Sequence, residues 1–268
     1  MTILDRIVTD VNSALSHRKR RVSLQQLQDE IEIQVPPKDF HASLTKPGIR
    51  VIAEIKNRSP SKGVLRSDFS VLDLMISYTV ASAAAISVLT EEQHFGGSLN
   101  HLRIASRDSS VPIIRKDFIV DPYQIYEARA SGADAILLIA AILDKNQLDE
   151  LHSLATELKM ASLVEVYDPV ELEKIDFSRI KILGVNNRNL HTFKVDLNHS
   201  LRIFELIDDH ITKVAESGMK SGQDLAYLHQ RGVDAFLIGE TLMRSKQPGL
   251  ALTLLIDETE KLLEEASN

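Results

Sequence analysis

Ser131-Gly-Ala-Asp-Ala-Ile-Leu-Leu138 and its near copy Arg231-Gly-Val-Asp-Ala-Phe-Leu-Ile238 are the segments that decide the fold of this chain. Each combines the end of a helix, a turn at glycine and the start of an apolar strand. A fainter copy is Ala81-Ser-Ala-Ala-Ala-Ile-Ser-Val88. A unit that recurs in this way predicts repeated helix-to-strand connections, and therefore parallel strands covered by helices.

Short apolar segments of this kind recur along the chain, about 26 residues apart, which is room for one strand, one helix and two loops. They are Val51–Ile55, Ala84–Leu89, Val111–Ile114, Asp134–Ile139, Ala161–Val166, Lys181–Val185, Ile211–Ala215 and Asp234–Ile238. Nearly continuous apolar runs are typical of parallel strands buried on both faces. Eight units favour a closed (β/α)8 TIM barrel over an open doubly wound sheet, which at this length has about five to seven strands.

Helix signals lie between the expected strands. Asp121-Pro122 and Asp168-Pro169 each place an N-cap residue before a proline at the first helical position. We expect helices over Tyr123–Ala130, Val170–Ile175, Ser221–Gln230 and Leu250–Leu263.

Residues 1–47 stand outside the repeat and predict a helical extension. Apolar residues from Ile3 to Leu15 recur at helical spacing, and Ser23 with Gln26 forms a capping box for a second helix that ends before Pro36-Pro37. The basic run from His17 to Arg21 is a solvated helix end or, alternatively, a phosphate contact. We therefore expect one barrel domain over residues 1–268, with residues 1–47 as its N-terminal extension.

Composition excludes several classes of protein. The 268 residues include 38 acidic and 31 basic side chains, a net charge of −7, and no cysteine, so disulfide scaffolds, thiolate metal sites and cysteine nucleophiles are excluded. The acidic balance argues against nucleic acid, and no apolar run approaches the ~20 residues of a membrane helix. Without a secretory signal, the expected location is the cytoplasm, as a monomer or alternatively a homo-oligomer. Histidine spacing and glycine motifs predict neither a metal nor a nucleotide cofactor.

Polar side chains stand where the expected strands end. They are Glu54, Lys56, Lys116, Glu165, Asn186 and Arg188. The carboxyl ends of barrel strands carry the chemistry of these folds, and buried charges without a function are costly. Such a cluster keeps a lysine charged as a general acid and a glutamate ionised as a base. The alternative is a buried salt-bridge network that only closes the barrel.

The last two expected strands end in small residues, at Glu216-Ser217-Gly218 and Gly239-Glu240. In TIM barrels the loops after these strands are the usual phosphate site. Glu240 would repel a phosphate, so it must point away or pair with a lysine. The basic loop from Asn57 to about residue 69 is longer than an ordinary connection and predicts a lid, with a plain loop as the alternative. These residues predict a phosphorylated small substrate and acid–base catalysis without a cofactor.

At these positions the chain resembles the indole-3-glycerol phosphate synthase family, over essentially its whole length. The motifs that carry the resemblance are Ile52–Gly63, Val88–Ser98, Ile114–Phe118, Asp121–Ile125, Leu163–Val166, Gly184–Leu190 and Ala215–Gly218. The resemblance implies ring closure of 1-(2-carboxyphenylamino)-1-deoxyribulose 5-phosphate, with loss of CO₂ and water, in tryptophan biosynthesis.

The resemblance also implies roles for single residues. Lys116 would protonate the sugar carbonyl, Glu54 would hold Lys116 in place, and Glu165 and Lys56 would serve the dehydration, in an order that stays open. Asn186 would hydrogen-bond a sugar hydroxyl or the reacting oxygen. The implied substrate contacts are Ser59 and Lys56 at the anthranilate carboxylate or the phosphate; Ser217, Gly218, Gly239 and Glu240 at the phosphate; Arg188 and Glu216; and Phe95, Phe118, Leu137 and Leu190 around the aromatic ring.

Three other functions are compatible with the pattern. Phosphoribosylanthranilate isomerase is a related phosphosugar barrel, but its chain is shorter and lacks the N-terminal helices. An aldolase with a Schiff-base lysine would be trapped by borohydride. A catalytically silent binding barrel is the non-enzyme alternative.

Overall fold

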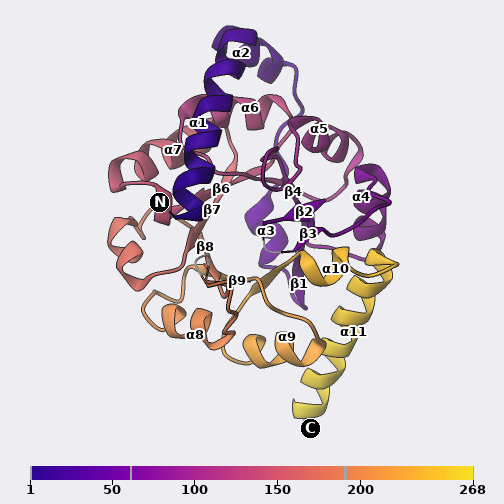
Figure 1. The fold of residues 1–268 in the computed structure, drawn as a ribbon. Helices are drawn as coiled ribbons and strands as arrows, with labels where there is room; N and C mark the ends of the chain where they lie inside the picture. Colours follow the sequence, from indigo (N-terminus) through magenta and orange to yellow (C-terminus); the bar gives the residue numbers. More distant parts are fainter. Residues whose placement is uncertain (1, 61, 190–191, 268) are drawn as a thin grey trace.

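Eight parallel strands close into a barrel in the order β1-β10-β9-β8-β7-β6-β5-β4 (Figure 1), which confirms the predicted TIM barrel. The structure is a computed structural model that describes residues 2–60, 62–189 and 192–267. The barrel strands are β1 (Arg50–Ile55), β4 (Ala85–Leu89), β5 (Ile113–Lys116), β6 (Ala135–Ile139), β7 (Ala161–Val166), β8 (Ile182–Asn186), β9 (Thr212–Glu216) and β10 (Ala235–Ile238). Each overlaps one of the segments expected from the sequence.

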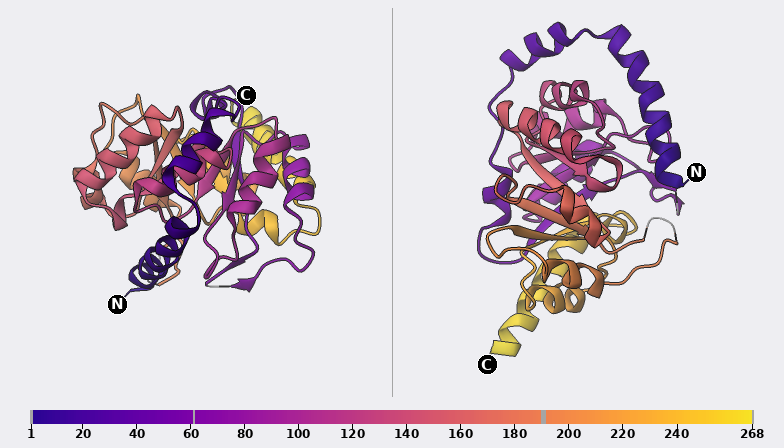
Figure 2. Two further views of the ribbon diagram at one scale, coloured as in Figure 1. Left: turned by 90° about the horizontal axis from the view of Figure 1, so that it is seen from above. Right: turned by 90° about the vertical axis from the view of Figure 1, so that its left-hand side faces the viewer.

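Helices surround the strands (Figures 1 and 2). They are α4 (Val71–Val80), α5 (Leu99–Asp108), α6 (Pro122–Ala130), α7 (Lys145–Glu157), α8 (Asn198–Phe204), α9 (Gly222–His229), α10 (Glu240–Met243) and α11 (Pro248–Ser267), with a 3₁₀ turn η1 (Ala140–Ile142). Asp121 caps α6 as expected, since its carboxylate accepts the Tyr123 N–H at 2.9 Å. The expected lid loop contains a two-stranded hairpin of β2 (Arg58–Ser59) and β3 (Gly63–Val64).

The helix expected over Val170–Ile175 is not an α-helix. The segment after Asp168 is instead a 3₁₀ helix, η2 (Pro169–Lys174). The Ile175 N–H donates to the Leu172 carbonyl oxygen, which is the tighter i to i−3 pattern. The Glu171 carboxylate also accepts the Tyr167 N–H at 2.8 Å, which links this segment to the residue that follows β7.

Alternation along the strands builds two apolar layers. Ile52, Ile114 and Leu163 belong to the cluster that fills the barrel, whereas Ile113 and Val164 belong to the layer between the barrel and its helices. Side chains two positions apart along a strand lie on the same face. Glu54, Lys116 and Glu165 each follow one of these inward-facing residues by two positions, so they also face the interior. This alternation is what directs the charged ends of β1, β5 and β7 into the barrel mouth.

The N-terminal extension consists of α1 (Ile3–Arg21), α2 (Leu24–Glu32) and α3 (Phe40–Leu44). The predicted capping box of α2 is confirmed, because the Gln26 N–H donates to Ser23 Oγ at 3.2 Å and the Ser23 N–H donates to Gln26 Oε1 at 2.7 Å. Helix α3 packs against β1 and β4, and α1 reaches the opposite end of the barrel. In the part of the chain that the structure describes, no helix has the length and apolarity needed to cross a membrane.

Two residues of the basic run at the end of α1 form ion pairs with α6 and with its N-cap residue. Arg18 Nε lies 2.8 Å from Glu127 Oε1, and Lys19 Nζ lies 2.7 Å from Asp121 Oδ2. Both carboxylates belong to the start or the body of α6. The run therefore docks the N-terminal helix onto the barrel.

Candidate active site

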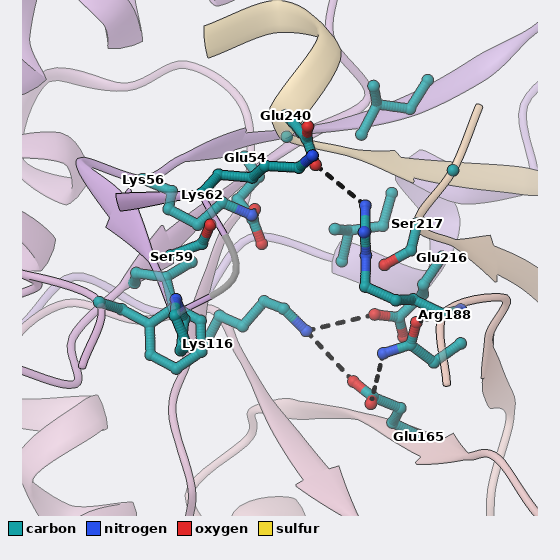
Figure 3. Close-up of a pocket in the computed structure, with 18 of the residues that line it drawn as sticks. Glu54, Lys56, Ser59, Lys62, Lys116, Glu165, Arg188, Glu216, Ser217 and Glu240 are labelled. Atoms are coloured by element: carbon teal, nitrogen blue, oxygen red, sulfur yellow. Dashed lines mark hydrogen bonds and ion pairs between the residues drawn. The ribbon is translucent and has the colours of Figure 1, made fainter. Parts of the chain in front are cut away.

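A cavity of about 580 Å³ opens at the carboxyl ends of the barrel strands (Figure 3). Every strand of the barrel contributes a side chain to it, and the first turns of α1 contribute Ile3, Leu4 and Ile7. All the site residues expected from the sequence line this cavity except Leu190, which lies outside the described residues. The barrel thus brings together residues that lie up to 186 positions apart, as between Glu54 and Glu240.

Lys116 lies between two carboxyl groups on the inner face of the barrel (Figure 3). Its Nζ lies 3.2 Å from Glu165 Oε2 and 3.2 Å from Glu216 Oε2, and Asn186 Nδ2 donates to the other oxygen of Glu165 at 3.1 Å. Burial lowers the pKa of Lys116, but the nearby carboxylates of Glu165, Glu216 and Glu54 outweigh it and raise that pKa well above its ordinary value. Lys116 is therefore positively charged and in contact with Glu165.

Burial strongly changes the pKa of the Glu216 carboxyl group. Desolvation raises its pKa to about 8, although the charge of Lys116 opposes the shift. Its Oε1 has no hydrogen-bond partner in the structure, and a Cβ at Gly184 would collide with that oxygen. Glycine at position 184 thus leaves the space that this carboxyl group occupies.

The resemblance implied only a substrate contact for Glu216, whereas the structure places it 3.2 Å from Lys116 Nζ. The available signal was the alternation along β9, because Val214 faces the barrel interior and Glu216 shares its face.

A second ion pair joins Glu54 to Lys56 at the end of β1. Glu54 is almost fully buried, and a Cβ at Gly239 would collide with its carboxylate, so this glycine also leaves room for an acid. The resemblance implied that Glu54 holds Lys116. In the structure Glu54 pairs with Lys56 instead, and its charge acts on Lys116 only by raising the pKa of that lysine.

The loops after β9 and β10, where the sequence predicts a phosphate site, form part of the cavity wall. Ser217 and Gly218 adopt positive φ angles of 66° and 91°, which turns the backbone sharply after Glu216. Glu240 pairs with arginines and not with a lysine: Arg188 Nη2 lies 2.9 Å and Arg244 Nε 3.5 Å from its carboxylate oxygens.

Three cationic residues that the sequence did not predict as site residues belong to the site. Lys62, Lys220 and Arg244 also line the cavity. Each lies within five residues of an expected site residue, so their nearness to the lid and to the two phosphate loops was the available signal.

The opposite side of the cavity is apolar. The rings of Phe95 and Phe118 lie 5.9 Å apart between centroids, and Leu137, Leu4 and Ile7 lie on the same cavity. Apolar and aromatic side chains of this kind can bury an aromatic ring. Within the described ranges, no group of three or more side chains is arranged to hold a metal ion.

Comparison with known structures shows the fold. 3-Hexulose-6-phosphate synthase from Salmonella typhimurium superposes with a TM-score of 0.64 at 12% identity, over 81% of this chain and 99% of that one. Tryptophan synthase subunit alpha from Legionella pneumophila superposes with a TM-score of 0.60 at 13% identity, over 84% and 98%.

Comparison of sequences identifies the family in addition to the fold. The family model "Indole-3-glycerol phosphate synthase" matches residues 4–255. The indole-3-glycerol phosphate synthase of Salinibacter ruber is 47% identical over 98% of both chains, and that of Dehalococcoides mccartyi is 49% identical over 91% of this chain and 95% of its own. With matches of this extent, the chain belongs to the indole-3-glycerol phosphate synthase family.

Proposed function

We propose that the cluster around Lys116 catalyses the conversion of 1-(2-carboxyphenylamino)-1-deoxyribulose 5-phosphate to indole-3-glycerol phosphate. As a member of its family, the chain is a carbon–carbon lyase of tryptophan biosynthesis. The observation that carries the proposal is a charged lysine held between Glu165 and Glu216 inside a cavity that has one cationic and one apolar side.

Ring closure needs a proton at the sugar carbonyl oxygen while the aromatic carbon that bears the carboxylate attacks the carbonyl carbon. Lys116 is the proton donor for this step, because its ammonium group faces the cavity and its charge is maintained by carboxylates. The attacking carbon, which now bears both the carboxylate and the new bond, then loses CO₂, and the electron pair of the broken carbon–carbon bond restores the aromatic ring.

Dehydration removes one hydroxyl group and one proton from the closed ring. Glu165 accepts the proton, since its carboxylate is fixed by Lys116 and Asn186 and lies on the cavity. Lys56 protonates the departing hydroxyl from the β1 side, where Glu54 keeps its ammonium group in place. The division follows from the chemistry of the two groups, because an ammonium ion donates a proton and a carboxylate accepts one.

The rest of the cavity orients the substrate. Arg188, Lys220 and Arg244, with the backbone N–H groups after β9 and β10, form the side for the phosphate. Phe95, Phe118, Leu137 and α1 form the side for the anthranilate ring, and Ser59 in the lid contacts the anthranilate carboxylate. Binding at both ends holds the reacting carbons near each other, which is the largest entropic contribution such a site can make.

The decisive experiment mixes the purified chain with this substrate, without metal or nucleotide, and follows indole fluorescence. The chain contains no tryptophan, so only tyrosine emission forms the background. We expect indole emission that disappears in Lys116→Ala. Absence of emission while the substrate still binds would contradict the proposal and favour an isomerase or a silent barrel.

We also propose that the chain acts in the cytoplasm as a monomer. Light scattering of the purified protein measures the second point directly, and a mass near twice 29.9 kDa would contradict it.

A further inference from the structure

Arg115 is the largest of the side chains that the fold buries almost completely, with 1% of its surface exposed. Its neighbours Ile114 and Lys116 face the barrel interior, so Arg115 faces the layer between the barrel and α6. A guanidinium group in such a layer is costly unless each N–H group finds a partner. Arg115 does not line the cavity, so substrate binding does not explain it.

The partners of Arg115 form a complete buried network. Its Nε donates to Thr90 Oγ1 at 3.0 Å, Nη2 donates to Asp117 Oδ2 at 2.9 Å, and Nη1 donates to the Gln124 carbonyl oxygen at 2.7 Å. Glu127 Oε2 lies 3.4 Å from Nη2. Every one of these partners is itself buried.

The same partners fix the backbone on both sides of the general acid. The Thr90 N–H donates to the Lys116 carbonyl oxygen at 3.1 Å, and the Thr90 hydroxyl donates to Asp117. Asp117 Oδ1 accepts the Phe118 N–H at 2.8 Å, and Gln124 Nε2 donates to the Phe118 carbonyl oxygen at 3.0 Å. Lys116 and Phe118 are thus held by their backbone and leave their side chains in the cavity.

The network also reaches the N-terminal helix. Glu127 receives Arg115 at one oxygen and Arg18 at the other, where Arg18 Nε lies 2.8 Å away. Arg18 belongs to α1, whose first turns line the cavity. One buried carboxylate therefore joins the element that carries Lys116 to the helix that covers the site.

We propose that Arg115 is a positioning residue for the reaction, acting through Thr90 and Asp117 on the placement of Lys116 and Phe118. The inference rests on the function proposed above for Lys116. Arg115 therefore affects catalysis although it does not line the cavity. A shift of about 1 Å in a reacting group lowers turnover by about 10²-fold, so loss of the network reduces kcat more than KM.

The test compares kcat and KM of substitutions in the network, at a temperature where circular dichroism shows each variant folded. We expect Arg115→Met to lower kcat by about 10²-fold and Thr90→Val by about tenfold, each with KM changed by less than about threefold. Thr90→Ser restores the hydroxyl group and is expected to keep kcat within about twofold of the parent. The rescue separates the hydrogen bond from the packing of the threonine.

Thr259→Val is the matched control. Thr259 is fully buried in α11, and its hydroxyl donates to the Leu255 carbonyl oxygen at 2.6 Å without any link to the site. We expect this variant to be less stable and to keep the parent kcat. If Arg115→Met does not fold, the Thr90 pair still decides.

A Thr90→Val variant with the parent kcat, or a Thr90→Ser variant as slow as Thr90→Val, would overturn the proposal. A parent chain that does not turn over would instead contradict the proposed function. The two failures are therefore distinguished in one assay.

Discussion

Arg115 and Lys116 are neighbours on β5, yet they face opposite sides of the barrel wall. Each is a cation that contacts two carboxyl groups: Asp117 and Glu127 for Arg115, Glu165 and Glu216 for Lys116. The side chain of Arg115 is 1% exposed and that of Lys116 is 17% exposed. The two residues thus show what the same kind of ion pair does against packed protein and against a cavity.

The difference lies in what each cluster leaves unsatisfied. Each of the three guanidinium nitrogens of Arg115 donates a hydrogen bond. Around Lys116, in contrast, Glu216 Oε1 has no partner, and burial raises the pKa of that carboxyl group to about 8. A fully satisfied network holds its members in place, whereas a network with an unpaired carboxyl oxygen and a shifted pKa keeps the capacity to exchange protons.

Replacing Lys116 tests the open cluster most strongly. We expect Lys116→Met to lower kcat by about 10³-fold, because a positioned general acid contributes about 10²–10⁴-fold. Indole fluorescence under saturating substrate measures the loss. Lys145→Met removes an exposed lysine on α7 and serves as the control for net charge. Turnover within tenfold of the parent would remove Lys116 from the mechanism.

Glu165→Gln keeps the size of the side chain but removes the carboxylate, and its single acceptor oxygen can receive only one of the two hydrogen bonds that Lys116 and Asn186 donate to Glu165. We expect kcat to fall by about 10²-fold, since the amide cannot accept the proton released in the dehydration. Accumulation of a decarboxylated but still hydrated intermediate, detected by mass spectrometry, would place the loss in that step. Unchanged turnover would assign the base role elsewhere.

The inward-facing half of this comparison was predictable from the sequence. A charged residue two positions after an inward-facing apolar residue lies on the same face of the strand. This rule predicts from the sequence alone that Glu54, Lys116 and Glu165 lie together at the barrel mouth. The closed barrel followed from the eightfold repeat, because only the number and spacing of apolar segments were needed.

The remaining features depend on distances that no local pattern encodes. Glu216 meets Lys116 across the barrel, 100 residues along the chain, and this contact follows from barrel closure. In the sequence Arg115 is simply a charged residue within a predicted strand. Its partners Thr90, in the loop after β4, and Gln124, on α6, are brought to it only by the fold. The docking of α1 likewise follows from ion pairs such as Arg18 with Glu127, over a separation of 109 residues.

Glu216→Gln tests whether this buried carboxyl group makes the free energy of unfolding depend on pH. In the folded chain the pKa of Glu216 is about 8, against 4.5 for an ordinary glutamate, so between these values the folded state binds a proton that the unfolded state has lost. The contribution of Glu216 to the free energy of unfolding is therefore full below pH 4.5 and lost as the pH rises through 8.

Urea unfolding of the parent and of Glu216→Gln at pH 5 and pH 8.5 measures this contribution. We expect the parent to lose at least about 1 kcal/mol more than the variant between the two pH values. Turnover of the variant is expected to fall by about tenfold, because Glu165 still holds Lys116. Parallel pH dependences would show that Glu216 is ionised in the folded chain across this range.

Leu137→Ala addresses the apolar side of the cavity and is expected to have the smallest effect on catalysis. Leu137 lies on β6, facing the interior, and contributes to the wall beside Phe95 and Phe118. Its loss removes contacts with the anthranilate ring in the ground state and the transition state alike, so KM should rise about fivefold while kcat changes by less than about threefold. The cavity left behind also lowers the free energy of unfolding by about 2–5 kcal/mol, so the assay is run well below the unfolding temperature. An unchanged KM would contradict the placement of the ring on this side, whereas a large fall in kcat would show that Leu137 also supports the position of Lys116 on the neighbouring strand.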